Sequence, residues 1–341
     1  MYAGSIPTPA SSILLPFAPA RVAKSLDAGD LKSPGRKAVP VGIRPRAPKQ
    51  HLATATSIHT SRTFPTLYRA ALAALCFLLA SCQGVLVHEV RSSYSHIQVF
   101  DSGGQRALYF GGDAGPRVVE TLMDLRQPHV LQHAYSHAAM MGFVYRPQAA
   151  SCLLIGLGGG AMVRFINHHF PEVRLDVVEI DPAMVAVARD FFGTREGPRT
   201  RILVADGFEY LARASERYDL VLVDAHLNPG ERTDSTGHPL SLKSEQFFGS
   251  IHERLNPGGV AMFNVIAGRD ASGYLDSIRR AFAATDVYRP RGTGNVLVFA
   301  VPRAPLAGEA ELRERAREFD RRGGYGFSFE RLLDDRDRRG E

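Results

Sequence analysis

The sequence predicts an α/β fold in which a mostly parallel sheet, covered by helices on both faces, follows a small antiparallel sheet. After residue 150, apolar runs typical of strands alternate with helical patterns, and this order builds a parallel sheet. Earlier runs are shorter, alternate apolar with polar residues and are separated by turn residues. A glycine-rich turn joins the first of the later runs to a helix.

The antiparallel sheet is expected within residues 85–110. The runs VLVHEVRS, YSHIQVFDS and RALYFGG alternate as half-buried strands do, and DSGGQ at 101–105 is typical of a turn between strands. A helix is expected next, over 130–143, where apolar residues recur at helical spacing.

The parallel sheet is expected to begin after RPQAAS. Strands are predicted at 151–156, 173–179, 201–205, 218–224, 258–265 and 294–301. The stretch LNPGGV at 255–260 is expected to end a helix and turn into a strand. The charged segment 309–322 is expected to form a solvated C-terminal helix, with a frayed tail after it.

The basic charge of the chain is concentrated near its N-terminus. The formal net charge is +6, yet residues 1–82 hold ten basic and two acidic residues, and the rest holds 31 and 33. The folded part therefore has no overall charge that would attract nucleic acid, and no nucleic-acid partner is expected. Residues 1–61 are rich in proline, alanine, serine and basic residues, so we expect them to be disordered or not translated.

Residues 62–82 have the order of parts found in a secretory signal. A basic stretch at 62–69 precedes eleven apolar residues at 70–80, too few to span a membrane, and the run ends in LASC. This box resembles the bacterial lipoprotein signal. The resemblance implies that Cys82 is the lipidated mature N-terminus and anchors the chain to a membrane surface outside the cytoplasm. The alternative is a buried apolar helix with a chance cysteine, in a cytoplasmic protein.

The glycine turn, LLIGLGGGAMVRF, has the geometry of a nucleotide cradle. Gly156 is expected to take a positive φ, and Gly158 to let a ligand approach the backbone. Gly159 and Gly160 are expected to open a helix whose first N–H groups are free for a ligand. The spacing Gly156-x-Gly158-x-x-Ala161 also matches the dinucleotide fingerprint. The structural alternative is a turn made only for tight strand–helix packing.

Acidic residues end the three strands after the glycine turn. Glu179 in VVEID could accept hydrogen bonds from both ribose hydroxyls, and Asp206 in VADGF could accept one from an adenine amino group. Asp224 ends the next strand, in LVLVDAH. The carboxyl ends of parallel strands share one edge of the sheet, where ligands bind. A lone strand-end aspartate is often a helix cap, but three such acids are more than capping requires.

These stretches, together with YDLVLVDA, SSYSHIQVFDS and YSHAAMMG, resemble the spermidine synthase family of aminopropyltransferases. The resemblance implies a class I methyltransferase-like Rossmann fold, with a mostly parallel seven-stranded sheet and a small N-terminal antiparallel β-domain. It implies decarboxylated S-adenosylmethionine as the cofactor, an amine as the acceptor, and pairing into a homodimer. By position, Glu179 would hold the ribose and Asp206 with Gly207 the adenine. Asp224 would accept the proton of the amine, and Tyr135 would line the acceptor pocket.

The chain also departs from this family. Gly159 stands where the family has an aspartate that binds the aminopropyl ammonium, and Leu227 stands where a second acid binds the substrate amine. The family's Tyr-His-Glu run is Tyr135-Ser136-His137 here, and its Tyr-Gln pair is Tyr94-Ser95. A desolvated diamine needs anionic partners at both ends, so we expect putrescine to bind poorly.

Other functions remain open from the sequence. Without the acid at Gly159 the chain could be a methyltransferase that uses ordinary S-adenosylmethionine. It could also be a non-catalytic, lipid-anchored family member, because adenosylated cofactors are kept in the cytosol. An NAD-dependent oxidoreductase would leave Asp206 and Asp224 without a specific role. His226, close after Asp224, is a candidate for substrate contact.

No metal site is expected. The three cysteines, Cys76, Cys82 and Cys152, lack a zinc spacing, and the His133–His137 pair lacks a third ligand. The predicted organisation of the chain is a disordered or untranslated segment, a signal, a β-hairpin domain, a nucleotide-binding domain and a charged C-terminal helix with tail. These parts span 1–61, 62–82, 83–129, 130–303 and 304–341.

Overall fold

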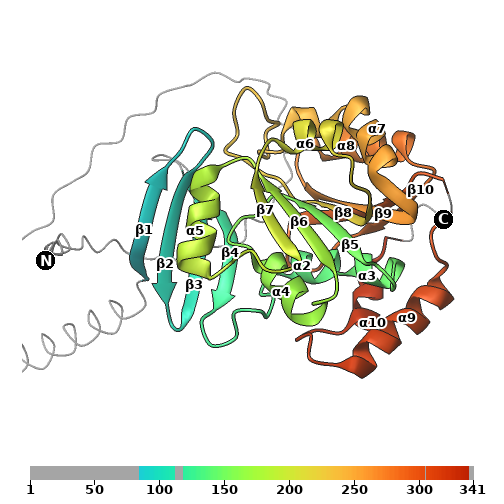
Figure 1. Ribbon diagram of the computed structural model, residues 1–341, viewed down its shortest axis with the longest axis horizontal. Helices are drawn as coiled ribbons and strands as arrows, with labels where there is room; N and C mark the ends of the chain where they lie inside the picture. The colour runs from blue at the N-terminus through green and yellow to red at the C-terminus, as the bar shows by residue number, and fades with distance from the viewer. Residues whose placement is uncertain (1–83, 112–117, 304, 338–341) are drawn as a thin grey trace, which may run out of the picture. The chain divides into compact units, whose positions relative to one another are not determined.

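The computed structural model describes residues 84–111, 118–303 and 305–337 (Figure 1). The predictions for 1–61 and for the signal at 62–82 with Cys82 lie outside the described residues. None of the helices within the described ranges is both long and apolar enough to cross a membrane.

The N-terminal sheet has four antiparallel strands in the order β1-β2-β3-β4. They are β1 (Val85–Arg91), β2 (His96–Ser102), β3 (Gln105–Phe110) and β4 (Val118–Asp124). The hairpins expected at 85–110 are confirmed, whereas β4 was not predicted. A β-bulge interrupts the β3–β4 pairing: Leu108 pairs with Thr121 and Tyr109 with Val119, which leaves Glu120 between them without a partner. Bulges redirect side chains and often lie beside functional sites.

The second sheet has seven strands in the order β10-β11-β9-β8-β5-β6-β7. They are β5 (Ser151–Ile155), β6 (Arg174–Glu179), β7 (Thr200–Val204), β8 (Tyr218–Val223), β9 (Leu255–Ile266), β10 (Ala284–Tyr288) and β11 (Asn295–Val301). The five neighbouring strands β9, β8, β5, β6 and β7 run parallel to one another. At the other end of the sheet β11 pairs antiparallel with β9, and β10 pairs antiparallel with β11. The predicted α/β fold is therefore confirmed, and β10 is the strand that the sequence pattern did not indicate.

Two local expectations need correction. A helix, Glu245–Arg254, does end just before 255–260 and a strand does follow, but the stretch is already the first part of β9 rather than a separate turn. The β8–β9 register shifts there between Tyr218 and Leu220, next to Gly258 at φ 73°. A glycine at positive φ can sit within an irregular strand as well as in a turn. The helix expected over 130–143 consists of two short helices, α2 (Ala134–Ala139) and α3 (Met141–Tyr145).

Helices cover both faces of the seven-stranded sheet (Figure 1). One core cluster joins the sheet to α2, α3, α4 (Ala161–His169), α9 (Glu309–Arg322) and α10 (Phe329–Leu332). The opposite cluster joins it to α6 (Gly207–Arg213), α7 (Glu245–Arg254) and α8 (Ala271–Ala281). The predicted helix at 309–322 is confirmed, but it is not wholly solvated, because Leu312, Ala316 and Phe319 are buried in the first cluster.

The small N-terminal sheet forms a third hydrophobic cluster together with a helix of the larger sheet. Its buried side chains, among them Ile97, Val99 and Leu108, pack against Met184 and Val187 of α5 (Pro182–Phe192). This packing brings β4 against the loop that follows β5, as the contacts of Thr121 below show.

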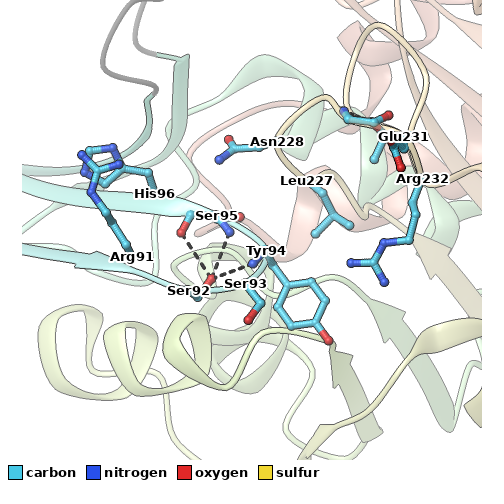
Figure 2. A pocket seen from close by; sticks show the side chains of 12 residues that line it. Arg91, Ser92, Ser93, Tyr94, Ser95, His96, Leu227, Asn228, Glu231 and Arg232 are labelled. Carbon is cyan, nitrogen blue, oxygen red and sulfur yellow. Dashed lines mark hydrogen bonds between the residues drawn. The ribbon is translucent and has the colours of Figure 1, made fainter.

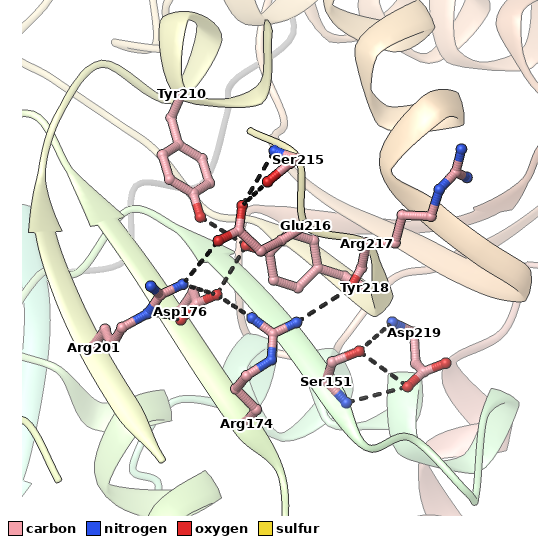
Figure 3. A network of polar contacts seen from close by, with 10 residues as sticks. All are labelled: Ser151, Arg174, Asp176, Arg201, Tyr210, Ser215, Glu216, Arg217, Tyr218 and Asp219. Carbon is pink, nitrogen blue, oxygen red and sulfur yellow. Dashed lines mark hydrogen bonds and ion pairs between the residues drawn. The ribbon is translucent and has the colours of Figure 1, made fainter. Parts of the chain in front are cut away.

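A charged network lies inside the seven-stranded sheet (Figure 3). The Asp176 side chain of β6 is fully buried and accepts hydrogen bonds from Arg174, Arg201 and the Tyr218 hydroxyl. Burial alone would raise the pKa of Asp176, but the hydrogen bonds from Arg201 and Tyr218 hold it below its usual value. The buried carboxylate is therefore charged and fully partnered.

Candidate functional site

The glycine turn holds the tip of β5 against the backbone that follows β8. Gly156 has φ 96°, and a Cβ atom there would lie 2.1 Å from the carbonyl oxygen of Asp224. The Asp224 N–H also donates to the carbonyl of Ile155 at 2.8 Å. Gly156 is thus required both by its positive φ, as predicted, and by the close approach of a neighbouring strand.

The N–H groups of Gly159 and Gly160 themselves have partners within the protein, and the expectation that the first N–H groups of the following helix are free for a ligand stays a prediction. The Gly159 N–H donates to Thr121 Oγ1 at 2.9 Å, and the Gly160 N–H donates to the Leu157 carbonyl. A Cβ atom at Gly159 would lie 2.8 Å from Thr121 Cγ2, and one at Gly160 would lie 2.3 Å from Thr194 Oγ1. Both glycines are buried because side chains of the protein itself pack against them.

Gly158 keeps the place that the sequence suggested. It has φ 52° and is partly exposed, like Gly156, whereas the three residues Leu157, Gly159 and Gly160 are buried. The helix α4 begins at Ala161 with Gly160 as its N-cap. Within this turn Gly156 and Gly158 are therefore the glycines that a ligand can approach, and Ala161 at the start of the helix is partly exposed as well.

The Glu179 carboxylate ends β6 and supports the glycine turn. It accepts hydrogen bonds from the Leu157 N–H and the Asp181 N–H, both at 2.9 Å. Burial raises the pKa of Glu179, against the lowering effect of these backbone donors. A carboxylate can accept about four hydrogen bonds, so two acceptor positions remain for a ligand such as a diol.

Asp206 and Gly207 lie where α6 begins. The Asp206 carboxylate caps this helix by accepting from the Phe208 N–H at 2.8 Å. A Cβ atom at Gly207 would lie 2.5 Å from Ile155 Cγ2, so this glycine allows the helix to pack on β5. Capping uses one carboxylate oxygen of Asp206. The second oxygen remains able to accept a hydrogen bond from a ligand, because the side chain is partly exposed.

Asp224 follows β8 and is held by side chains. Its Oδ1 accepts a hydrogen bond from Asn264 Nδ2 at 2.6 Å, and its Oδ2 lies 3.5 Å from the Tyr135 hydroxyl. The Asp224 side chain is 12% exposed. Asn264 is itself oriented by Asn295, whose Nδ2 donates to Asn264 Oδ1 at 3.0 Å. The structure therefore joins the predicted pair, Asp224 and Tyr135, and adds two asparagines.

The two asparagines were missed in the sequence, although one signal was present. Asn264 is the only amide in the buried run VAMFNVI of β9, and a buried polar side chain needs a partner. Asn295 opens β11 and carried no comparable signal.

His226 lies beside Asp224 but does not hydrogen-bond to it. His226 Nδ1 is 3.9 Å from Asp224 Oδ1, and Nε2 is 3.4 Å from Nδ1 of the buried His238. His238 in turn contacts the Tyr274 hydroxyl at 3.0 Å. Burial lowers the pKa of His226, against the raising effect of Asp224, so His226 is neutral at pH 7. The predicted substrate contact at His226 stays a prediction.

Glu120 is an acidic residue of this site that the sequence analysis did not identify. It occupies the bulge of β4, next to Thr121, and lies near enough to Asp224 and Tyr135 to interact with them electrostatically. Burial and, secondly, repulsion from Asp224 raise the pKa of Glu120 to about 8. Among the described residues, none donates a hydrogen bond to the Glu120 carboxylate or forms an ion pair with it. Its position depends on an unpredicted strand and on its bulge, so no sequence signal was available.

A pocket of about 550 Å³ lies between the β1–β2 turn and the loop that follows Asp224. Figure 2 shows Leu227 and Arg232 of this loop opposite Tyr94 and Ser95. The Arg232 guanidinium lies 5.8 Å from the centre of the Tyr94 ring. The lining residues are Arg91, Ser92, Ser93, Tyr94, Ser95, His96, Leu227, Asn228, Gly230, Glu231, Arg232 and Thr233. The structure thus brings together the Tyr94-Ser95 pair and Leu227, and Glu231 is the single carboxylate among these lining residues.

No group of three potential metal ligands lies close enough together within the described ranges to hold an ion. His137 Nε2 is 2.9 Å from the carbonyl of Leu131, and its ring stacks on Phe327. His133 Nε2 is buried without a partner in the described structure.

Comparison with known proteins relates this arrangement to a family. The family model of the spermine/spermidine synthase domain matches residues 132–266. The polyamine aminopropyltransferase of Chromobacterium violaceum is 32% identical over 236 residues, which make up 68% of this chain and 86% of that protein. The chain belongs to the spermidine synthase family. The resemblance seen in the sequence is therefore confirmed.

Solved structures support the fold of this spermidine synthase family member. A spermidine synthase in complex with the transition-state analogue AdoDATO has a TM-score of 0.57 at 20% identity, covering 73% of this chain and 84% of that one. Human methyltransferase-like protein 13 in complex with SAH has a TM-score of 0.52 at 26% identity, covering 60% and 99%. The human eEF1A lysine and N-terminal methyltransferase is 31% identical over 198 residues, 54% of this chain and 28% of that protein. The predicted methyltransferase-like fold is confirmed.

Proposed function

We propose that this chain transfers an aminopropyl group from decarboxylated S-adenosylmethionine to an amine acceptor. The observation that carries the proposal is the Asp224 carboxylate, which lies at the carboxyl edge of the sheet and is oriented by Asn264. Its other oxygen points toward the Tyr135 hydroxyl. A carboxylate in this position suits the removal of a proton from an attacking amine. The match to an enzyme named polyamine aminopropyltransferase supports the same reaction.

The residues around the glycine turn fit an adenosyl group. Gly158 is partly exposed, and Glu179 has two acceptor positions left after its bonds to backbone N–H groups. In this proposal Glu179 binds the ribose hydroxyls. Asp206 accepts from the adenine amino group with the oxygen that does not cap α6, and Gly207 lies beside it. Strand-end positions at one sheet edge favour this arrangement.

A bound adenosyl sulfonium supplies an electrophilic carbon next to its positive sulfur and a neutral thioether as leaving group. Asp224 accepts the proton of the acceptor nitrogen as that nitrogen bonds to the carbon and the carbon–sulfur bond breaks, with its electron pair going to sulfur. Asn264 holds the carboxylate in one orientation, so little reorganisation is needed at the moment of transfer. Tyr135 lines the place of the acceptor beside Asp224.

The acceptor is proposed to be an amine whose far end is not cationic. Leu227 lines the pocket beyond Asp224, where Arg232 and Arg91 outnumber the one carboxylate, Glu231. A second ammonium group would be desolvated there beside arginines. Weak binding of putrescine follows from this charge balance.

The proposal is tested by measuring release of methylthioadenosine when the full chain is incubated with decarboxylated S-adenosylmethionine and a series of amines. The series includes putrescine and monoamines of the same length. Loss of a general base lowers rates by about 10²–10⁴-fold, so Asp224→Asn should fall by that factor. Asp190→Asn is the control, because Asp190 lies on the exposed side of α5 and bonds only to its neighbour Arg189. No release with any amine, or full activity of Asp224→Asn, would contradict the proposal.

Methyl transfer from ordinary S-adenosylmethionine is the second candidate, because one relative is named a lysine and N-terminal methyltransferase. The same incubations with S-adenosylmethionine decide between the two reactions. S-adenosylhomocysteine is the product of methyl transfer, and methylthioadenosine is the product of aminopropyl transfer.

We further propose that residues 62–82 act as a lipoprotein signal, that Cys82 is lipidated, and that the chain forms a homodimer. The LASC box supports the first two statements and the resemblance to paired enzymes the third. Anchoring outside the cytoplasm would separate the site from cytosolic cofactor. Fractionation with mass spectrometry of the N-terminus and Cys82→Ser tests the anchor, and light scattering tests the dimer. A mature chain that begins before Cys82 in the soluble fraction would contradict lipidation.

A further inference from the structure

The bulge in β4 places an acidic side chain where the proposed reaction handles positive charge. Glu120 is the residue without a pairing partner between Val119 and Thr121, and a bulge turns its side chain away from the direction that regular alternation would give. The next residue of the strand, Thr121, contacts the glycine turn, which brings this part of β4 close to the site. Glu120 is also near enough to Asp224 and Tyr135 for their charges to act on one another: Asp224 raises the pKa of Glu120, and Glu120 raises that of Tyr135.

Among the residues that the structure describes, no lysine or arginine forms an ion pair with the carboxylate of Glu120 or of Asp224. The Asp224 carboxylate accepts from the neutral amide of Asn264, and the neutral Tyr135 hydroxyl lies next to it. Asp224 faces His133 and His226 too, and burial lowers the pKa of both histidines, so they are neutral at pH 7. Two carboxyl groups that influence each other, with these neutral groups around them, favour a ligand that brings a positive charge.

We infer that Glu120, together with Asp224, binds the ammonium group of the aminopropyl chain and so selects decarboxylated over ordinary S-adenosylmethionine. The inference rests on the proposed function. The two cofactors share the adenosine and the sulfonium. Ordinary S-adenosylmethionine carries an additional carboxylate on the carbon next to its ammonium group. The Asp224 carboxylate repels it, and so does Glu120 once the ammonium group has displaced the proton of Glu120.

The raised pKa of Glu120 gives this inference a second, independent readout. With a pKa of about 8, Glu120 holds its proton in the free protein at pH 7. An ammonium group stabilises the carboxylate form and lowers that pKa, so binding releases about one proton at pH 7. The affinity for the decarboxylated cofactor should then rise by about tenfold per pH unit from pH 6 to 7.

The experiment is calorimetric titration of the full chain with methylthioadenosine, decarboxylated S-adenosylmethionine and S-adenosylmethionine. Methylthioadenosine lacks the aminopropyl group, so it reports on the adenosine site alone. The variant is Glu120→Gln, which keeps shape and removes charge. The control is Asp124→Asn, which removes a carboxylate from the same strand. Among the described residues, the Asp124 carboxylate accepts a hydrogen bond only from the nearby Arg126 N–H. Titrations in two buffers of different ionisation enthalpy count the protons released.

We expect Glu120→Gln to weaken binding of the decarboxylated cofactor by about tenfold or more, the loss typical of a hydrogen bond between charged groups. Binding of methylthioadenosine should change by less than about twofold, and Asp124→Asn should leave both unchanged. Proton release should accompany the decarboxylated cofactor in the wild type and vanish in Glu120→Gln.

The outcomes separate the inference from the proposed function. If methylthioadenosine binds and Glu120→Gln leaves the affinity for the decarboxylated cofactor unchanged, Glu120 is not the ammonium site and the proposed function still stands. If Glu120→Gln weakens both ligands equally, Glu120 acts only on the structure of the site, and the inference is overturned. If no adenosyl compound binds, the proposed function and the inference fail together.

Discussion

Replacement of Gly156 by alanine is expected to destabilise the protein strongly. At φ 96° a side chain costs about 1–2 kcal/mol, because the left-handed region crowds Cβ against the backbone. The new Cβ would also lie 2.1 Å from the carbonyl oxygen of Asp224 and 2.7 Å from its carbonyl carbon. These are backbone atoms that cannot rotate away, and such overpacking costs about 1–3 kcal/mol more. The free energy of unfolding should therefore fall by about 2–5 kcal/mol.

Two other glycines are matched controls for Gly156→Ala in urea unfolding at equilibrium. Gly193 has φ 66° and nothing within 4 Å of its virtual Cβ, so Gly193→Ala should cost only the strain of about 1–2 kcal/mol. Gly249 lies exposed inside α7, also in open space, and Gly249→Ala should stabilise by up to about 1 kcal/mol. If Gly156→Ala costs no more than Gly193→Ala, the close approach of the two backbones is refuted.

Three further predictions concern polar side chains. Asp176→Asn should lower the free energy of unfolding by about 2 kcal/mol in urea titrations, because it removes the charge that Arg201 bonds to; a loss below about 0.5 kcal/mol would contradict the buried network. Asn264→Ala should lower kcat by about tenfold or more with little change in KM, because Asp224 loses the hydrogen-bond donor that orients it. A change in KM alone would argue against this orienting role of Asn264. Burial would raise the pKa of Asp234, but a hydrogen bond from Lys243 holds it well below its usual value. Asp234→Asn should therefore cost about 1–2 kcal/mol at pH 7, and the difference from the wild type should begin to shrink only as the pH falls below about 4, the usual range of an aspartate pKa. A difference that stays constant between pH 5 and pH 2 would exclude this cause.

The parallel part of the fold could be predicted because its signals are local. Buried strands such as β8 are continuous apolar runs, and the charged helix at 309–322 has an uninterrupted pattern. β10 and β4 escaped prediction for a physical reason. Both include exposed or half-buried residues, and their pairing partners rather than their own composition define them as strands.

The sequence predicted only those residues of the candidate site that lie at the ends of strands. Glu179, Asp206 and Asp224 follow apolar runs, so the sequence places them at one edge of the sheet. Glu120, Asn264 and the contact of Thr121 with Gly159 depend on how two sheets pack, and packing between distant segments leaves no periodic pattern.

The position of Thr121 makes the residue types at positions 121 and 159 depend on each other. Its hydroxyl and methyl group fill the space in front of Gly159, so an acidic residue at 159 has no room while threonine occupies 121. Any attempt to engineer the glycine loop toward the aspartate of related enzymes would have to shorten residue 121 in the same step. An acidic residue at 159 alone would collide with Thr121, and a smaller residue at 121 alone would leave a void. Introducing the acidic residue therefore requires both substitutions together.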